Sequence, residues 1–234
     1  MRIALVADLH GNRPATEALD ADLSLVKPDR IICLGDIVGK GPSSDFTFDW
    51  AMAHCDLVLG GNWDYGLGKR MFSPADMFYW DQLGQDRLAQ LRALPKEHEL
   101  YMSGRRVRLF HGRPVMRDLV MSHHKSDLIE PFFVDGEGQP FDVVIYADAH
   151  RQSMRTMKVG LFVNVGSVGN ALAVPKCCYA LMEGEEGPMP APFEIRLRQL
   201  EYDREQAVLD AENTPLLPRG DCFVRELITG LYSR

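Results

Sequence analysis

The stretch that decides the fold is MRIALVADLHGN, residues 1–12. Its apolar run, residues 3–7, has the length and composition of a buried strand, and a glycine-containing turn follows it. Alternate residues of an extended segment point the same way, so Asp8 and His10 can turn a carboxylate and an imidazole towards one cation. A capping aspartate and a surface histidine would give the same letters, so this stretch alone leaves both interpretations open.

Strand and helix patterns alternate in the residues that follow. Apolar runs predict strands over residues 30–34 and 55–59, and helical spacing is predicted over residues 14–26 and 45–53. The first of these strands ends in Gly35-Asp36, and the second ends in GGNWD, which contains Asn62 and Asp64. Alternation of this kind predicts a largely parallel sheet, whose ligands bind at the carboxyl ends of the strands. We therefore expect the polar residues at these ends to meet in space.

The second half of the chain has a different pattern of predicted elements. It predicts a helix over residues 76–94, a hairpin over 98–110, a short helix near 127–133, and mainly antiparallel strands over 141–147, 155–159, 161–165, 177–183 and 193–201. Residues 65–74 and 113–139 are predicted to be loops that carry specificity. Two helical pieces around Pro215 and Pro218 are expected in residues 203–234, as an extension packed on a single domain of residues 1–234.

Composition excludes several classes of protein. The 26 lysines and arginines against 33 acidic residues give a net charge of −7, which argues against a broad nucleic-acid-binding surface. No apolar run approaches the roughly 18 residues of a membrane span, and the first run is too short for a cleaved signal, so we expect a cytoplasmic protein. The five cysteines are odd in number and form no C-x-x-C pair, which is typical of reduced thiols.

Polar residues follow two later strands as well. His111 comes directly after the predicted hairpin, and Asp148 and His150 come directly after residues 141–147. Together with the earlier clusters they form a set of oxygen and imidazole ligands without a thiolate. That set suits Mn²⁺, Fe, Zn²⁺ or Mg²⁺ in five- or six-coordinate sites, whereas a structural zinc site more often uses cysteine.

The series DLHGN, GDIVGKGP, GNWD, FHG, ADAH and NVGSVG resembles the calcineurin-like metallophosphoesterases, and it is most similar to their small prokaryotic phosphodiesterase branch. The resemblance runs from residue 2 to about residue 200 with the motifs in order. It implies an α/β fold, a four-layer α/β/β/α sandwich with two mixed β-sheets flanked by helices.

The resemblance also implies a centre of two divalent metal ions. Asp8, His10 and His150 would hold one ion, Asn62, His111 and Asp148 would hold the other, and Asp36 would bridge them. A water shared by the two ions would lose its proton and attack phosphorus in line. Manganese is the cation we expect first, with iron, zinc, magnesium or nickel as alternatives.

Two positions depart from the family pattern. Asp148 stands where the family commonly has a histidine, and a carboxylate there favours harder cations such as Mn²⁺ and lowers the Lewis acidity of that ion, unless it only caps the strand. Trp63 stands where many members have a histidine that protonates the leaving group, which an indole cannot do. Candidate substitutes for that acid are Asp64, His123 and His124, although the histidine pair is also typical of a solvated loop.

Other polar residues are candidates for binding substrate or supporting the ligands. Arg113 and Lys40 are predicted to hold phosphate together with Asn62, although each cation also fits an ordinary surface position. Asn12 and Asn164 are predicted to orient metal ligands through hydrogen bonds.

These observations predict a dinuclear phosphodiesterase or phosphatase that hydrolyses small nucleotide or aryl phosphodiesters, with a small phosphorylated molecule as its partner. Two alternatives stay open. The loops GDIVGKGP and NVGSVG are compatible with a dinucleoside polyphosphate hydrolase. A non-catalytic protein-binding scaffold of the same fold, such as one retromer subunit, is the other.

Overall fold

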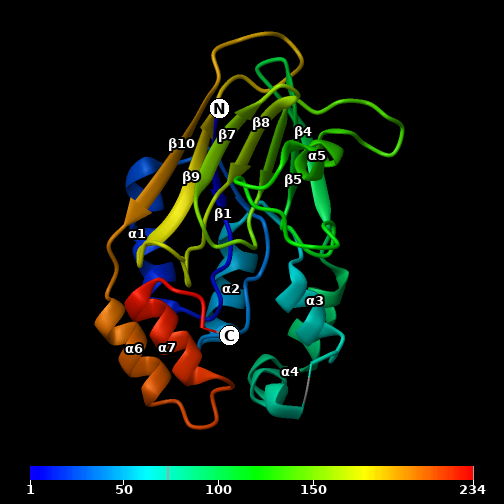
Figure 1. The fold of residues 1–234 in the computed structure, drawn as a ribbon. Coiled ribbons are helices and arrows are strands. Elements are labelled where there is room, and N and C mark those ends of the chain that lie inside the picture. Colours follow the sequence, from blue (N-terminus) through cyan, green and yellow to red (C-terminus); the bar gives the residue numbers. More distant parts are fainter. Residues whose placement is uncertain (73, 234) are drawn as a thin grey trace.

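The computed structural model describes residues 1–72 and 74–233. Its centre is a pair of five-stranded sheets that face each other (Figure 1). The first sheet has the order β10 (Glu194–Leu200), β9 (Cys177–Glu183), β1 (Arg2–Val6), β2 (Arg30–Cys33) and β3 (Leu57–Val58). The second has the order β4 (Glu97–Met102), β5 (Arg105–Phe110), β6 (Val143–Tyr146), β8 (Gly160–Asn164) and β7 (Ser153–Met157).

Helices cover the outer faces of both sheets. The longer ones are α1 (Arg13–Val26), α2 (Ser44–His54), α3 (Asn62–Gly68), α4 (Met77–Ala93), α6 (Arg204–Glu212) and α7 (Gly220–Thr229). A short α5 (Ser126–Ile129) and a 3-10 turn (Glu130–Phe133) lie on the outer side of the second sheet. Among the described residues, no helix is both long enough and apolar enough to span a membrane.

Strand β1 shows how the sequence builds these layers. Ile3 and Leu5 point into the apolar core between the two sheets, while Ala4 and Val6 point into the core beneath the helices. A strand with both faces buried needs a continuous apolar run, which is what residues 3–7 provide. A third apolar cluster lies under α5. The four-layer α/β/β/α prediction is therefore confirmed.

Parallel pairing aligns the strand ends that carry polar residues. Strands β1, β2 and β3 are parallel to one another, and so are β5, β6 and β8. The prediction of a mainly antiparallel second half is wrong for these last three. The chain crosses over through α5 before it enters β6, and the β7–β8 hairpin then returns β8 to the edge of β6.

Two local predictions also need adjustment. Residues 65–74 are not wholly a loop, because α3 occupies Asn62–Gly68. The Asp64 carboxylate accepts a hydrogen bond from the Gly61 N–H at 2.9 Å, which is the capping interaction of a helix start. The predicted helix over residues 76–94 forms as α4, but its helical geometry breaks at Gly84, where φ is 70°.

The C-terminal residues share the core of the first sheet. Ala207 and Ala211 of α6 pack into the same apolar cluster as α1, and Phe223 and Leu227 of α7 pack there too. Glu226 of α7 lies 3.9 Å from Lys40, which stands in the loop after β2. The helix pair α6–α7 is therefore close to the strand ends that carry the predicted ligands.

Candidate metal centre

The carboxyl ends of the parallel strands bring five predicted ligands together. They form two groups that share Asp8, one with His10 and His150 and the other with Asp36 and His111. In each group the ligand atoms lie within 4.8 Å of one another. The expectation that the strand-ending residues meet in space is confirmed for these five.

Both carboxylates reach histidines of both groups. Asp8 Oδ1 lies 3.3 Å from His150 Nε2 and 3.8 Å from His111 Nε2. Asp36 Oδ2 lies 3.3 Å from His111 Nε2 and 3.6 Å from His10 Nε2. Each carboxylate is therefore within reach of both ligand groups, and the bridging role of Asp36 stays a prediction.

All three histidines present the same nitrogen to the centre. His10 Nδ1 lies 3.1 Å from the Val38 carbonyl oxygen, His111 Nδ1 lies 3.1 Å from that of Leu34, and His150 Nδ1 lies 2.6 Å from that of Asn170. A carbonyl oxygen can only accept, so each Nδ1 carries a proton, and Nε2 is the nitrogen whose lone pair can bind a cation when the ring is neutral. His10 Nε2 and His150 Nε2 lie only 3.2 Å apart. A metal-ligating histidine commonly has one ring nitrogen hydrogen-bonded to a carbonyl oxygen and the other directed at the metal, as these three rings do.

The donor set fits divalent cations. Among the buried side-chain atoms that make no well-formed hydrogen bond within residues 1–72 and 74–233, four belong to predicted ligands, namely both carboxylate oxygens of Asp8, Asn62 Oδ1 and His111 Nε2. Buried polar atoms normally have partners, and unpaired ones in a cluster indicate a binding site. Carboxylate, amide and imidazole donors of this kind suit Mn²⁺, Fe, Zn²⁺ or Mg²⁺.

The backbone is strained at the same residues. Five non-glycine residues of the site have φ between 48° and 60°, in the left-handed region: Asp8, His10, Asp36, Asp148 and His150. Aspartate and histidine enter this region more easily than most side chains, yet it remains costly. Glycine is needed where the loops touch, because a Cβ on Gly61 would collide with Asp36 Oδ1. The loops are shaped to present ligands.

Burial, Lys40 and the carboxylates shift the pKa values of two of the histidines in opposite directions. Burial, reinforced by the Lys40 ammonium, lowers the pKa of His10 to about 4. Burial acts in the same direction on His111, but Asp36 and Asp8 outweigh it and raise the pKa of His111 to about 10. Negative charge is thus concentrated where a cation would lie.

Comparison with known proteins identifies the family. A model of the calcineurin-like phosphoesterase superfamily domain matches residues 1–187. The chain belongs to this superfamily. The resemblance read from the motifs is confirmed.

Relatives of similar length share the whole fold. An uncharacterised protein of Methanocaldococcus jannaschii is 24% identical over 229 residues, which cover 88% of this chain and 89% of the relative. A hypothetical protein of Pyrococcus horikoshii OT3 superposes with a TM-score of 0.78 at 19% identity, over 99% of both chains. A metallophosphoesterase from Sphaerobacter thermophilus superposes with a TM-score of 0.72 at 21% identity, also over 99% of both chains.

Asp148, the first departure from the family pattern, is bound to an arginine. Arg113 Nη2 donates to Asp148 Oδ1 at 2.6 Å, and Arg113 Nε donates to Oδ2 at 2.7 Å. The backbone N–H of Arg113 also donates to Oδ2, at 3.0 Å. Burial would raise the pKa of Asp148, but Arg113 and His111 outweigh it and lower that pKa. Among the described residues, Asp148 belongs to neither ligand group, and its contacts favour an ion-pair role.

This geometry makes Asp148→Asn informative. Because both carboxylate oxygens already accept from Arg113, we expect the substitution to leave the number of bound metal ions unchanged while loosening the guanidinium. Metal content, measured by mass spectrometry after desalting, is the readout, with Arg113→Met as the matched variant. Loss of about one ion per chain in Asp148→Asn alone would instead establish Asp148 as a ligand.

Asp64 does not have the contacts of a general acid. It is fully buried, and it accepts from the backbone N–H groups of Asp36 at 2.7 Å, Ile37 at 3.0 Å and Gly61 at 2.9 Å. Burial and the Asp36 carboxylate raise its pKa to about 7. We reinterpret Asp64 as a residue that ties the Asp36 loop to the start of α3. Trp63 lies beside it with its ring edge-on to His10, 5.9 Å between centroids.

The predicted supporting asparagines act on the backbone. Asn12 Oδ1 accepts from the Ala15 N–H at 3.2 Å and caps α1, and its Nδ2 donates to the Gly169 carbonyl at 2.7 Å. Asn164 Nδ2 donates to the Ala147 carbonyl at 2.6 Å, directly before Asp148. These hydrogen bonds fix the backbone beside the candidate ligands, and the prediction that Asn12 and Asn164 orient metal ligands stays a prediction.

Lys40 is buried, and it belongs to a network that sequence analysis did not find. Its Nζ donates to Asn170 Oδ1 at 2.7 Å and lies 3.9 Å from Glu226 Oε2. Asn170 ends the motif NVGSVGN, so its position was a usable signal. Glu226 offered a weaker one, since it interrupts the apolar face formed by Phe223 and Leu227.

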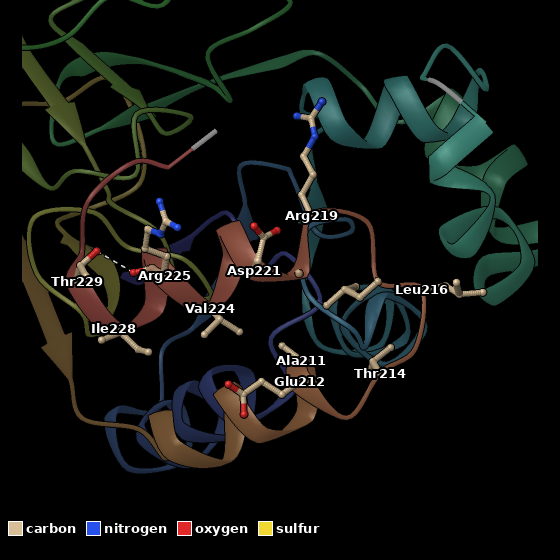
Figure 2. Close-up of a pocket in the computed structure, with 12 residues that line it drawn as sticks. Ala211, Glu212, Thr214, Leu216, Arg219, Asp221, Val224, Arg225, Ile228 and Thr229 are labelled. Carbon is tan, nitrogen blue, oxygen red and sulfur yellow. Dashed lines mark hydrogen bonds between the residues drawn. The ribbon is translucent and has the colours of Figure 1, made fainter.

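Two further surface features lie outside the ligand groups. His123 and His124 line a depression together with Lys125 and Leu128, away from the five gathered ligands. A pocket between α6 and α7 is lined by side chains such as Leu216, Val224 and Ile228 (Figure 2). Neither contains a residue of the two ligand groups.

Proposed function

We propose that this protein is a dinuclear metal-dependent phosphodiesterase that hydrolyses small nucleotide or aryl phosphodiesters. The observation that carries the proposal is the pair of buried ligand groups that share Asp8, with three imidazole Nε2 atoms turned towards them. Membership of the phosphoesterase superfamily supports hydrolysis of a phosphoric ester in general.

The ligands divide between two cations. Asp8, His10 and His150 would hold one, and Asp36, His111 and Asn62 would hold the other, with Asp36 or Asp8 touching both. When bound, two divalent ions would supply Lewis acidity and activate the water nucleophile. Manganese is our first choice, because carboxylates and an amide oxygen stand among the donors.

Two cationic side chains are candidates for orienting the phosphate. Lys40 Nζ donates to Asn170 Oδ1 at 2.7 Å, and the Asn170 carbonyl oxygen lies 2.6 Å from His150 Nδ1, so the ammonium is one residue away from a candidate ligand. Asp148 anchors Arg113 through an ion pair, and the Arg113 side chain is 44% exposed. We propose that both bind phosphoryl oxygens, Arg113 through its planar fork and Lys40 as a point charge.

We expect the leaving group to depart without protonation by a side chain. Trp63 packs against His10, Phe72 and Tyr79, and an indole N–H does not titrate in the range that a general acid requires. The Asp64 carboxylate already accepts hydrogen bonds from three backbone N–H groups. Aryl phosphodiesters, whose phenolate leaving group is already stable, therefore suit this site better than alkyl monoesters.

The direct test is hydrolysis of bis-p-nitrophenyl phosphate. We expect turnover with Mn²⁺ that stops after chelation and returns when the metal is added back, because the ligand groups cannot activate water without a cation. Iron, zinc, magnesium and nickel are assayed in parallel. Absence of turnover with every cation would contradict the proposal and leave the protein-binding scaffold as the better interpretation.

A substrate comparison separates the proposed phosphodiesterase from a dinucleoside polyphosphate hydrolase. The pair to compare is a 2′,3′-cyclic nucleotide and diadenosine tetraphosphate, assayed under the metal conditions that support the aryl ester. A preference for the cyclic nucleotide supports the phosphodiesterase. A preference for the tetraphosphate would replace it with the hydrolase of dinucleoside polyphosphates.

A further inference from the structure

The C-terminal helix α7 reaches the edge of the metal centre. It lies beyond residue 187, where the match to the superfamily model ends. Its inner face carries Phe223, Glu226 and Leu227, all buried, whereas Val224 and Ile228 line the pocket on its other side (Figure 2). Glu226 is thus a carboxylate on a face that is otherwise built to pack on the core.

Ser233 and Lys40 both contact the Glu226 carboxylate. The N–H of Ser233 donates to Glu226 Oε1 at 3.1 Å, so the chain folds back over the end of α7. Glu226 Oε2 faces the Lys40 ammonium at 3.9 Å. The neighbouring Ala173 N–H donates to the Gly230 carbonyl at 2.8 Å and ties this end of the helix to the loop after β8.

Lys40 connects Glu226 to a candidate ligand. Its Nζ donates to the Asn170 side chain at 2.7 Å, and the Asn170 carbonyl lies 2.6 Å from His150 Nδ1. A single asparagine therefore fixes both the ammonium and the imidazole. The order along this network is Glu226, Lys40, Asn170 and His150.

The ion pair is buried. Glu226 is fully buried and Lys40 is 5% exposed, so both charges have given up most of their hydration. Buried charges need additional polar contacts, and Asn170 provides one to Lys40 while Ser233 provides one to Glu226. The arrangement fixes the ammonium against Asn170, whose carbonyl oxygen contacts the candidate ligand His150.

We propose that Glu226 is a positioning residue that holds the Lys40 ammonium against Asn170, so that Lys40 meets a phosphoryl oxygen of the bound ester. The C-terminal helix pair then contributes to the phosphate site in addition to packing on the core. This inference rests on the proposed function for the identity of the ester. An ammonium carries three N–H donors, and one of those on Lys40 serves Asn170.

The experiment measures binding of inorganic phosphate to the metal-loaded full-length protein by calorimetry. We expect Glu226→Gln to weaken phosphate binding about fivefold and Lys40→Met to weaken it about tenfold, since a charge-assisted contact is lost or misplaced. Metal content should stay unchanged in both. Glu212→Gln, an exposed glutamate at the end of α6, is the matched control and should bind phosphate like the unmodified protein.

A double-mutant cycle decides whether Glu226 acts through Lys40. If it does, Glu226→Gln adds no further loss in the Lys40→Met background. Full additivity, or unaltered phosphate binding in Glu226→Gln, would overturn the proposal. Should Glu226→Gln fail to fold, Glu226→Asp keeps the charge but retracts it, and it should show an intermediate loss; normal binding in that variant would count against the proposal.

Activity provides a separate readout. With bis-p-nitrophenyl phosphate, Glu226→Gln should raise KM more than it lowers kcat, because the substitution affects how the anion is held and leaves the metal ligands in place. Phosphate binding does not require turnover. A protein that binds phosphate through Lys40 but hydrolyses no diester would therefore contradict the proposed function and leave the role of Glu226 intact.

Discussion

Replacing Asp36 by alanine is expected to reduce kcat for bis-p-nitrophenyl phosphate by at least about a thousandfold. The Asp36 carboxylate lies within 3.6 Å of both His10 Nε2 and His111 Nε2, so its loss removes negative charge from both ligand groups. The number of bound metal ions should fall at the same time. Steady-state kinetics together with metal analysis by mass spectrometry provide the measurement.

A matched aspartate controls for the loss of one acidic residue. Asp81 is exposed on α4, and Asp81→Ala should keep both activity and metal content. Asp36 Oδ1 also accepts from the Trp63 N–H at 2.8 Å, so the melting temperature of Asp36→Ala is measured alongside to detect a general loss of folding. A folded Asp36→Ala protein that keeps more than about a tenth of the activity would refute the two-metal assignment.

The largest effect on stability is expected for Asp64→Ala. Three buried backbone N–H groups, of Asp36, Ile37 and Gly61, donate to this one carboxylate. Each buried donor left without an acceptor costs about 1–3 kcal/mol, so we expect a loss of about 3–6 kcal/mol in the free energy of unfolding. Urea denaturation, with the midpoint and slope compared with the unmodified protein, measures it.

The isosteric variant sharpens this prediction. Asp64→Asn keeps one acceptor oxygen in place, so it should lose less stability than Asp64→Ala while still disturbing the Asp36 loop. Asp81→Ala again provides the exposed control, with an expected change within about 0.5 kcal/mol. A loss below about 1 kcal/mol in Asp64→Ala would show that other groups or water replace the carboxylate.

The opening strand and the ligand series were readable because each depends on local rules. A doubly buried strand requires an unbroken apolar run, and residues 3–7 have one. Parallel strands bring their carboxyl ends to one edge, so polar residues directly after such strands converge. Asp8, His10 and Asp36 could be expected to meet in this way, whereas His111 and His150, which follow strands predicted as a hairpin or as antiparallel, were placed with them by the family resemblance.

Several roles depended on contacts between segments far apart in the chain. Arg113 and Asp148 were separately predicted to bind phosphate and metal, yet they form an ion pair with each other. Asp64 looked like an acid beside the site, but the loops of Asp36 and Gly61 surround it with amide donors. A side chain can serve only the partners that reach it, and sequence spacing does not show which distant groups arrive.

The chain thus specifies its layers, its strand ends and the types of ligand through local patterns of apolar and polar residues. Only the tertiary structure decides how the negative charge is arranged among these ligands and which cationic side chains lie near them. Lys40 and Glu226 show the difference most clearly, because one follows β2 and the other lies on the last helix. Electrostatic and hydrogen-bond contacts act over a few ångströms, so packing determines them.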